Sequence, residues 1–154
     1  MPIPAVGSTA PDFTLSYTAG QTITLSSYRG VRHVLLAFFP LAFTSTCTAE
    51  VCAFSEDYSQ FESQAVAVLP ISVDSVQTLR EFKAKHAIAV EMASDFKREV
   101  SRAYGVLNDD KFYSNRAYFL IDKAGILRWA HIETANGDRR ENAELLGAIA
   151  ALPG

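Results

Sequence analysis

The sequence predicts an α/β fold in which helices flank one mixed β-sheet. Dense apolar segments of strand length alternate with segments whose apolar residues recur every three or four positions, and a strand pair followed by a helix closes the chain. Of the 154 residues, 49% are hydrophobic and 20% are charged, which suits one domain over residues 1–154 with a sizeable core. The chain shows no internal repeat and no linker rich in Pro, Gly or Ser.

The first predicted elements are an N-terminal β-hairpin and a core strand. Residues 12–15 and 22–25 alternate polar with apolar side chains on either side of a turn at 18–21. A buried strand is expected over residues 33–39, because residues 34–43 form the longest unbroken apolar run. That run is about half of the ~20 residues that a membrane-spanning helix requires, so we expect no membrane span.

The rest of the chain alternates between helix and strand. A helix is expected over residues 44–61, with four apolar residues at spacings of three and four on one face: Val51, Phe54, Tyr58 and Phe61. The later elements are a strand at 66–73, a helix at 76–86, a short strand at 90–93, a helical turn at 99–104 closed by Gly105, a hairpin of strands 117–121 and 126–131, and a helix at 141–152.

The composition argues against several classes of partner. A formal net charge of −3 gives no general attraction to phosphate backbones, so we expect no nucleic-acid binding. The first seven residues lack the basic and apolar regions of a leader, so we expect a cytoplasmic protein. His33, His86 and His131 show no recognised metal-ligand spacing with the two cysteines, and no Gly-rich phosphate loop occurs. We therefore expect neither a metal nor a cofactor.

Cys47 lies where the core strand is expected to pass into a helix. The first turn of a helix favours an anion, because its backbone N–H groups are unpaired and the macrodipole is positive there, so this position suits a nucleophilic thiolate. Thr44, three residues earlier, can place its hydroxyl near the sulfur, and Pro40 ends the strand. Taken alone, Thr44 is more typical of a helix cap than of a catalytic site, and Pro40 is more typical of a strand terminator.

The combination Pro40, Thr44 and Cys47 resembles the active-site signature of the peroxiredoxin family. Glu50 resembles an acidic residue that often follows this signature, and Arg116, at the start of a strand, resembles the family's distal arginine. The resemblance implies a thioredoxin-like fold and a thiol-dependent peroxidase with Cys47 as peroxidatic nucleophile. It also implies that Thr44 and Arg116 stabilise charge on the peroxide oxygens, that Glu50 orients Arg116, and that Pro40 shields the sulfenate from bulk water.

Without the resemblance, Arg116 is also typical of a solvated strand edge and Glu50 of a helix surface. The likeness extends over nearly the whole chain, from residues 10–13 through 38–40 to 116–122 and the final helix.

Cys52 follows Cys47 by five residues. In an intact helix this spacing places the two Cα atoms about 9 Å apart, beyond the ~7 Å limit for a disulfide, so bonding requires the helix to open. The spacing resembles the bacterioferritin co-migratory (PrxQ) branch of the family, which implies that Cys52 resolves the Cys47 sulfenic acid. Residues 38–44 instead resemble the alkyl hydroperoxide reductase E branch, which lacks this cysteine and uses an external thiol.

Several alternatives stay open at this point. Cys52 can be a bystander in a one-cysteine enzyme, and the protein can be a redox sensor that signals through Cys47 oxidation instead of clearing peroxide. A cysteine hydrolase would require a histidine base near Cys47. Hydrogen peroxide and organic hydroperoxides are both candidate substrates, and thioredoxin, a glutaredoxin-like protein or a small thiol is the candidate reductant. The loop 41–43 and Tyr104 are candidates for a homodimer surface, although such aromatic residues are more often core.

Overall fold

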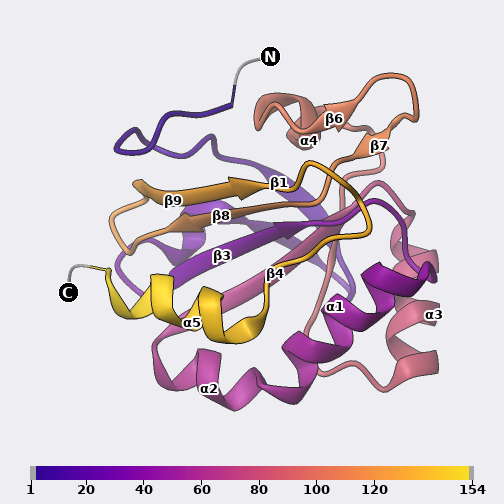
Figure 1. Cartoon of the computed structure of the whole chain (residues 1–154), viewed down its shortest axis with the longest axis horizontal. Helices are drawn as coiled ribbons and strands as arrows, with labels where there is room; N and C mark the ends of the chain where they lie inside the picture. The colour runs from indigo at the N-terminus through magenta and orange to yellow at the C-terminus, as the bar shows by residue number, and fades with distance from the viewer. Residues whose placement is uncertain (1–2, 153–154) are drawn as a thin grey trace.

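A seven-stranded mixed β-sheet lies at the centre of the computed structural model, which describes residues 3–152 (Figure 1). Its strands are β1 Thr14–Tyr17, β2 Thr22–Thr24, β3 His33–Phe38, β4 Val66–Ser72, β5 Ala93–Ser94, β8 Ala117–Ile121 and β9 Leu127–Ile132. They lie in the order β2-β1-β5-β4-β3-β8-β9. The strands β3, β4 and β5 are parallel, and the other pairings are antiparallel. The predicted α/β class with a mixed sheet is confirmed.

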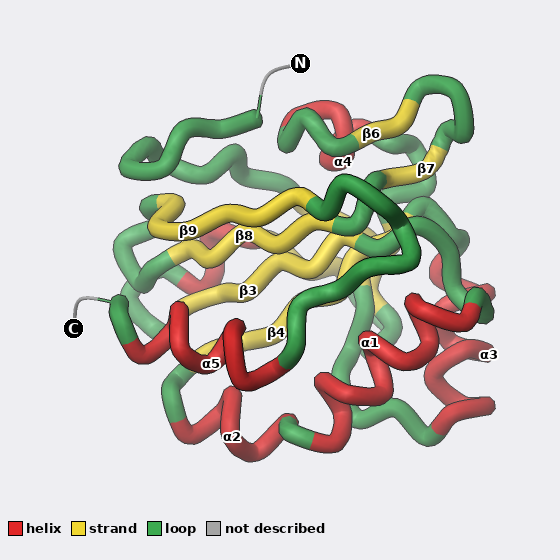
Figure 2. Tube along the Cα trace, viewed as in Figure 1, coloured by secondary structure: helices red, strands yellow, loops and turns green. Residues whose placement is uncertain are grey.

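Helices cover both faces of the sheet. They are α1 Ser45–Glu56, α2 Tyr58–Ser63, α3 Val76–His86, α4 Glu99–Ala103 and α5 Asn142–Ala150. α1, α2, α3 and α5 lie on one side, and α4 and the N-terminal segment lie on the other (Figure 2). Both faces of β3 are consequently buried: Leu35 and Ala37 belong to the hydrophobic cluster on the first side, Leu36 and Phe38 to that on the second. This two-sided burial explains why the strand reads as a continuous apolar run.

Most predicted elements are present with small shifts in their bounds. The N-terminal hairpin is formed by β1 and β2, and β1 also pairs with β5, which joins the hairpin to the main sheet. The short strand expected at 90–93 begins only at Ala93. A second, two-stranded sheet of β6 Leu107–Asn108 and β7 Tyr113–Ser114 was not predicted, because two residues are too few to show alternation. Met1 and Pro2, at the start of the segment examined for a leader, lie outside the described residues.

The prediction of a single helix over residues 44–61 is wrong, because the helix is interrupted at Asp57 and forms α1 and α2. Asn142 of α5 contacts both sides of the break: its Nδ2 donates to the carbonyl of Ala53 and to Asp57 Oδ2, each at 2.8 Å. The Ala53 carbonyl also accepts the last helical hydrogen bond of α1, from the N–H of Asp57 at 3.2 Å, so Asn142 adds a second donor to it. After the break Tyr58 is 36% exposed instead of facing the core, whereas Phe61 is buried.

Tyr104, a candidate for the dimer surface, is instead a core residue. It is fully buried, its hydroxyl donates to the carbonyl of Pro11 at 2.7 Å, and its ring packs against Phe38 and Phe119. That part of the dimer prediction is wrong. Over residues 3–152, no helix has both the length and the apolar character needed to cross a lipid bilayer.

Candidate active site

Cys47 lies in the first turn of α1, which begins at Ser45 directly after the loop that leaves β3. The backbone hydrogen bond at the start of this helix runs from the N–H of Thr48 to the carbonyl of Thr44 at 2.9 Å. The N–H groups of the three preceding residues therefore have no acceptor within the helix. They give this end of α1 a partial positive charge beside the sulfur, as the sequence predicts.

The loop of residues 40–44 is held in an uncommon conformation. Phe43 has a φ of 70°, in the left-handed region that a bulky residue rarely adopts. Two contacts compensate for this strain: the N–H of Ala42 donates to Asp74 Oδ2 at 2.8 Å, and the Phe43 ring packs edge-on against Phe82 with centroids 5.1 Å apart. Asp74, in the turn between β4 and α3, therefore fixes the approach to Cys47.

We expect Asp74→Ala to destabilise the protein by about 1–3 kcal/mol, since it leaves the Ala42 N–H without its acceptor and removes the acceptor of the Ser72 hydroxyl. Urea unfolding followed by circular dichroism measures this change. Asp109→Ala, at an exposed site, is the matched control and should shift the midpoint very little. Equal midpoints for both variants would show that Asp74 does not anchor the loop.

Arg116 brings β8 into contact with the sulfur. Its Nη2 lies 3.1 Å from Cys47 Sγ and also donates to the carbonyl of Asn136 at 3.0 Å, while Nη1 forms a 2.7 Å ion pair with Glu50 Oε1. β8 lies beside β3 in the sheet, so the antiparallel pairing places the start of β8 next to the end of β3, where α1 begins. The register Phe38↔Ala117 thus positions Arg116 across from the site.

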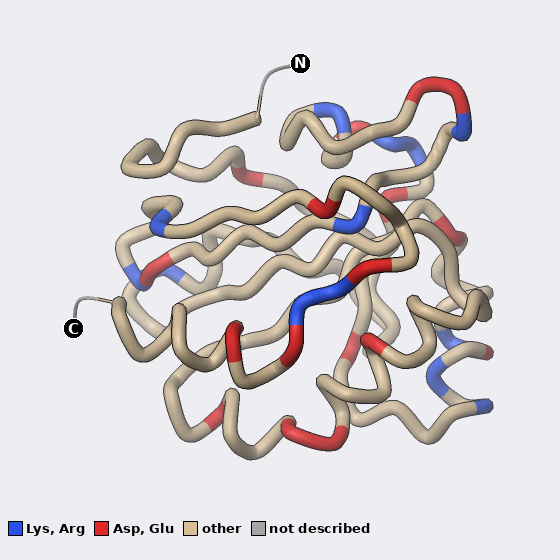
Figure 3. Tube along the Cα trace, in the orientation of Figure 1, with Lys and Arg blue, Asp and Glu red and all other residues tan. Residues whose placement is uncertain are grey.

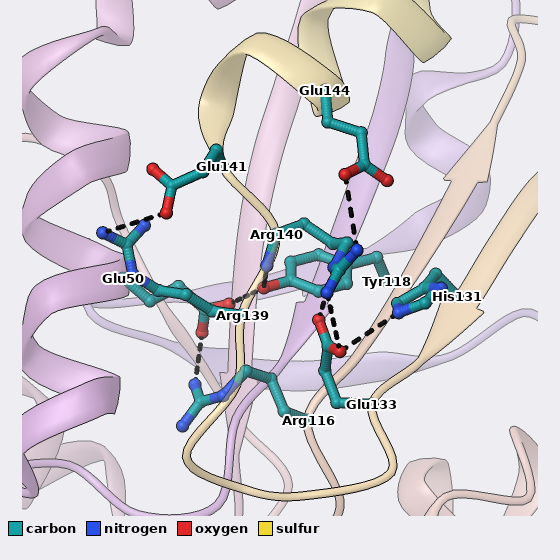
Figure 4. A network of polar contacts seen from close by, with 9 residues as sticks. All are labelled: Glu50, Arg116, Tyr118, His131, Glu133, Arg139, Arg140, Glu141 and Glu144. Atoms are coloured by element: carbon teal, nitrogen blue, oxygen red, sulfur yellow. Dashed lines mark hydrogen bonds and ion pairs between the residues drawn. The ribbon is translucent and has the colours of Figure 1, made fainter.

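Arg116 and Glu50 are both only 1% exposed, so the strand-edge and helix-surface alternatives for them are wrong. Burial raises the pKa of the Glu50 carboxyl above its ordinary value, while Arg116 and the hydroxyl of Tyr118 oppose that rise. Burial by itself would lower the pKa of the Arg116 guanidinium, but the charges of Glu50 and Cys47 raise it, so Arg116 stays a cation. Glu50 lies between Arg116 and Tyr118 in Figure 4.

A pocket of about 240 Å³ reaches Cys47. It is lined by Pro40, Leu41, Thr44, Ser45, Thr46, Cys47, Tyr113, Arg116, Asn136 and Gly137. The structure therefore brings four predicted site residues to one cavity, with Glu50 behind them. Cys47 itself is 1% exposed, so this pocket is the route by which a small substrate would reach the sulfur. Among these lining residues there is no histidine, which leaves the hydrolase alternative without a base.

Thr44 occupies the N-cap position of α1 but does not cap the helix with its side chain. Its hydroxyl donates instead to the carbonyl of Leu41 at 2.7 Å. This bond uses the hydroxyl hydrogen and leaves the oxygen lone pairs free on the pocket wall. The structure thus places Thr44 at the pocket without a hydrogen bond to the sulfur.

Cys52 lies in the same helix as Cys47, and both are free thiols. It is partly buried against the hydrophobic cluster on the α1 side of the sheet. Burial, with a smaller contribution from the charge of Glu56, raises the pKa of the Cys52 thiol. Cys52 is therefore protonated and weakly nucleophilic near neutral pH in this conformation.

Sequence reasoning missed Tyr118 and Asn136. Tyr118, in β8, follows two residues after Arg116, which directly precedes that strand. Its side chain therefore points to the same face of the sheet, and this period of two is a signal that could have found it. Asn136 contributes a backbone carbonyl from the loop between β9 and α5, a contact for which no side-chain pattern exists. Acidic and basic residues follow one another where that loop enters α5 (Figure 3).

Comparison with known proteins identifies the family. A model described as the AhpC/TSA family matches residues 6–130. The chain belongs to the AhpC/TSA family. Alkyl hydroperoxide reductase E of Mycobacterium tuberculosis is 40% identical over 149 residues, which cover 96% of this chain and 97% of that protein. A putative peroxiredoxin of Synechocystis is 38% identical over 94% of this chain and 78% of its own length.

Solved structures agree with this membership of the AhpC/TSA family. A reduced 2-Cys peroxiredoxin of Plasmodium vivax matches with a TM-score of 0.89 at 32% identity, covering 96% of this chain and 82% of that one. AhpC of Mycobacterium tuberculosis matches with a TM-score of 0.88 at 27% identity, covering 97% of this chain and 93% of that one. The predicted resemblance, the thioredoxin-like fold and the assignment as a peroxiredoxin-type peroxidase are confirmed.

Proposed function

We propose that this AhpC/TSA enzyme reduces hydrogen peroxide and organic hydroperoxides through Cys47. The thiolate attacks one peroxide oxygen, an S–O bond forms, and the O–O bond breaks with its electron pair passing to the other oxygen. That oxygen takes up a proton and leaves as water or an alcohol. Sulfur is oxidised to the sulfenic acid, and the peroxide is reduced.

The observation that carries this proposal is the 3.1 Å contact between Arg116 Nη2 and Cys47 Sγ inside the pocket. A guanidinium there, together with the N–H groups at the start of α1, favours the thiolate and the charge that develops on the peroxide oxygens. We assign Pro40 and Thr44 to the wall that admits the substrate, and Glu50 to the orientation of Arg116.

Intact-mass analysis of the protein after one equivalent of peroxide tests the proposal. We expect a sulfenic-acid trap that is present from the start to label the peptide that contains Cys47, with the trap bonded to sulfur and the sulfenic hydroxyl released as water. Substoichiometric protein should also consume peroxide repeatedly when a thiol reductant is supplied. Stoichiometric oxidation without turnover would instead support the sensor alternative.

We further propose that Cys52 resolves the sulfenic acid as an intramolecular disulfide. Both thiols lie in α1, so the first turns of that helix must unwind before the sulfurs meet. The spacing of the two cysteines supports this cycle. The similarity to alkyl hydroperoxide reductase E and the partial burial of Cys52 support a one-cysteine cycle, the second candidate.

We expect Cys52→Ser to keep the first peroxide turnover but to lose the intramolecular disulfide. In the wild type, the disulfide should form faster as pH rises, because burial raises the pKa of Cys52 in the folded helix and even an exposed cysteine is mostly protonated at neutral pH, whereas the attack requires the thiolate. Non-reducing mass spectrometry after peroxide treatment at several pH values measures both effects. An unchanged non-reducing mass of the treated wild type would reject Cys52 as the resolving thiol.

Thioredoxin, a glutaredoxin-like protein or a small thiol is the proposed reductant that closes the cycle. We also propose a homodimer and a cytoplasmic location. Phe43, 47% exposed beside the pocket, supports a surface for a second copy of the chain.

A further inference from the structure

The hydroxyl of Tyr118 lies between the active-site carboxylate and the segment that precedes α5. The side chain is fully buried, and its hydroxyl donates to Glu50 Oε2 and accepts from the backbone N–H of Arg140 at 3.0 Å. Both hydrogen-bonding functions of the phenol are thus used. Figure 4 shows the Tyr118 hydroxyl beside the Glu50 carboxylate and the backbone of Arg140.

The Tyr118 hydroxyl favours the charged form of Glu50. Its carboxylate is almost completely buried, and each oxygen has one donor: Oε1 receives Arg116 Nη1 at 2.7 Å, and Oε2 receives the Tyr118 hydroxyl. Burial raises the pKa of Glu50, and Arg116, Tyr118 and, more weakly, Arg139 act against that rise. Removing one of two donors from a buried carboxylate favours its protonated form.

The segment 133–141 depends on the same hydroxyl. Arg140 forms a 2.7 Å ion pair with Glu133, at the other end of this segment, and its N–H donates to Tyr118 in β8. Asn136 and Gly137 of this segment line the pocket, and the carbonyl of Asn136 accepts from Arg116 Nη2 at 3.0 Å. Arg116 has three partners: Glu50, the Asn136 carbonyl and the Cys47 sulfur. Tyr118 bonds to the first of these and to the segment that carries the second.

We propose that Tyr118 is a positioning residue for the Cys47 reaction: its hydroxyl keeps Glu50 ionised and the segment 133–141 closed, so that Arg116 stays directed at the sulfur. The proposal rests on the function proposed for Cys47 and Arg116. It differs from a packing role, because the Tyr118 ring would fill the core equally well without its hydroxyl.

The test is Tyr118→Phe, which removes only the hydroxyl. The infrared absorption of a protonated buried carboxyl reports Glu50 directly as a function of pH, and its loss in Glu50→Gln identifies the band. We expect this band to appear about one pH unit higher in the Tyr118→Phe variant, as the loss of a hydrogen bond to a charged group predicts. Single-turnover oxidation of Cys47, followed by stopped flow, should lose its rate over the same pH range.

Tyr104→Phe is the matched control. It also removes the hydroxyl of a fully buried tyrosine, but that hydroxyl donates to the carbonyl of Pro11 and belongs to the cluster on the other face of the sheet. This variant should keep the wild-type infrared midpoint, even where its stability falls. The proposal is overturned if the infrared midpoint of Glu50 rises equally in both variants, or does not rise in Tyr118→Phe. It is also overturned if that midpoint shifts in Tyr118→Phe while the pH dependence of the oxidation rate stays unchanged.

Two further measurements keep the outcome decisive. If Tyr118→Phe fails to fold, all tyrosines can be replaced by 3-fluorotyrosine, whose more acidic hydroxyl is a stronger hydrogen-bond donor. The infrared midpoint of Glu50 must then fall, and an unchanged midpoint overturns the proposal. If the wild type shows no peroxide oxidation at Cys47, the proposed function fails. The infrared midpoints of the two phenylalanine variants then still show whether the Tyr118 hydroxyl holds Glu50 ionised.

Discussion

Cys47→Ser is expected to abolish catalytic consumption of hydroperoxide. A serine hydroxyl stays un-ionised near neutral pH, and it cannot pass through the sulfenic acid on which the cycle depends. The substitution hardly changes the size of a side chain that lies at the start of α1, so the fold should persist. Peroxide consumption in the presence of excess dithiol, at substoichiometric protein, measures the loss.

Cys52→Ser is the matched control, because it makes the same chemical change five residues along the same helix. It should still react with one equivalent of peroxide at the wild-type rate. Turnover that survives Cys47→Ser but fails in Cys52→Ser would transfer the nucleophile to Cys52 and reject the proposed mechanism.

Arg116→Met is expected to slow oxidation of Cys47 by about 10²–10³-fold, the loss typical when one preorganised donor is removed from a developing negative charge. Methionine is about as long as the aliphatic part of arginine, but it has no positive charge and no hydrogen-bond donor to place near the sulfur. Stopped-flow measurement of a single oxidation, with saturating and subsaturating peroxide, separates this effect from later reduction of the enzyme.

Stability must be separated from chemistry in that experiment. Arg116→Met leaves the Glu50 carboxylate buried without its cation, which should cost about 3–5 kcal/mol of unfolding free energy. Adding Glu50→Gln removes the unpaired charge, and the double variant should regain most of the stability but not the rate. A double variant as fast as the wild type would show that Arg116 serves only to neutralise Glu50.

Much of the fold follows from local patterns. The apolar run at β3 and the three- and four-residue spacing in α1 predict a strand that passes into a helix, and Cys47 lies at that junction because one pattern ends where the other begins. The pairing of Arg116 with this junction does not follow from such patterns. It requires the antiparallel placement of β8 beside β3, and only the family resemblance indicated it.

The remaining features depend on contacts between distant segments. The predicted helix breaks beside the contact between Asn142 and Ala53, 89 positions earlier, and no pattern within the helix marks that point. Asn136 acts through its carbonyl, which every residue possesses. Phe43 adopts a left-handed conformation that its side chain disfavours, so local propensity argued against the turn that the tertiary contacts impose.

The separation of Cys47 and Arg116 by 69 positions has a consequence during synthesis. The ribosome delivers the cysteine well before the arginine, and the guanidinium reaches the sulfur only after β8 has docked against β3. Until then the nascent chain carries an ordinary thiol, without the cation that this site requires. Incomplete chains and proteolytic fragments that end before Arg116 should therefore react with peroxide only as slowly as an ordinary cysteine does, and the fast thiol arises only after β8 has joined the sheet.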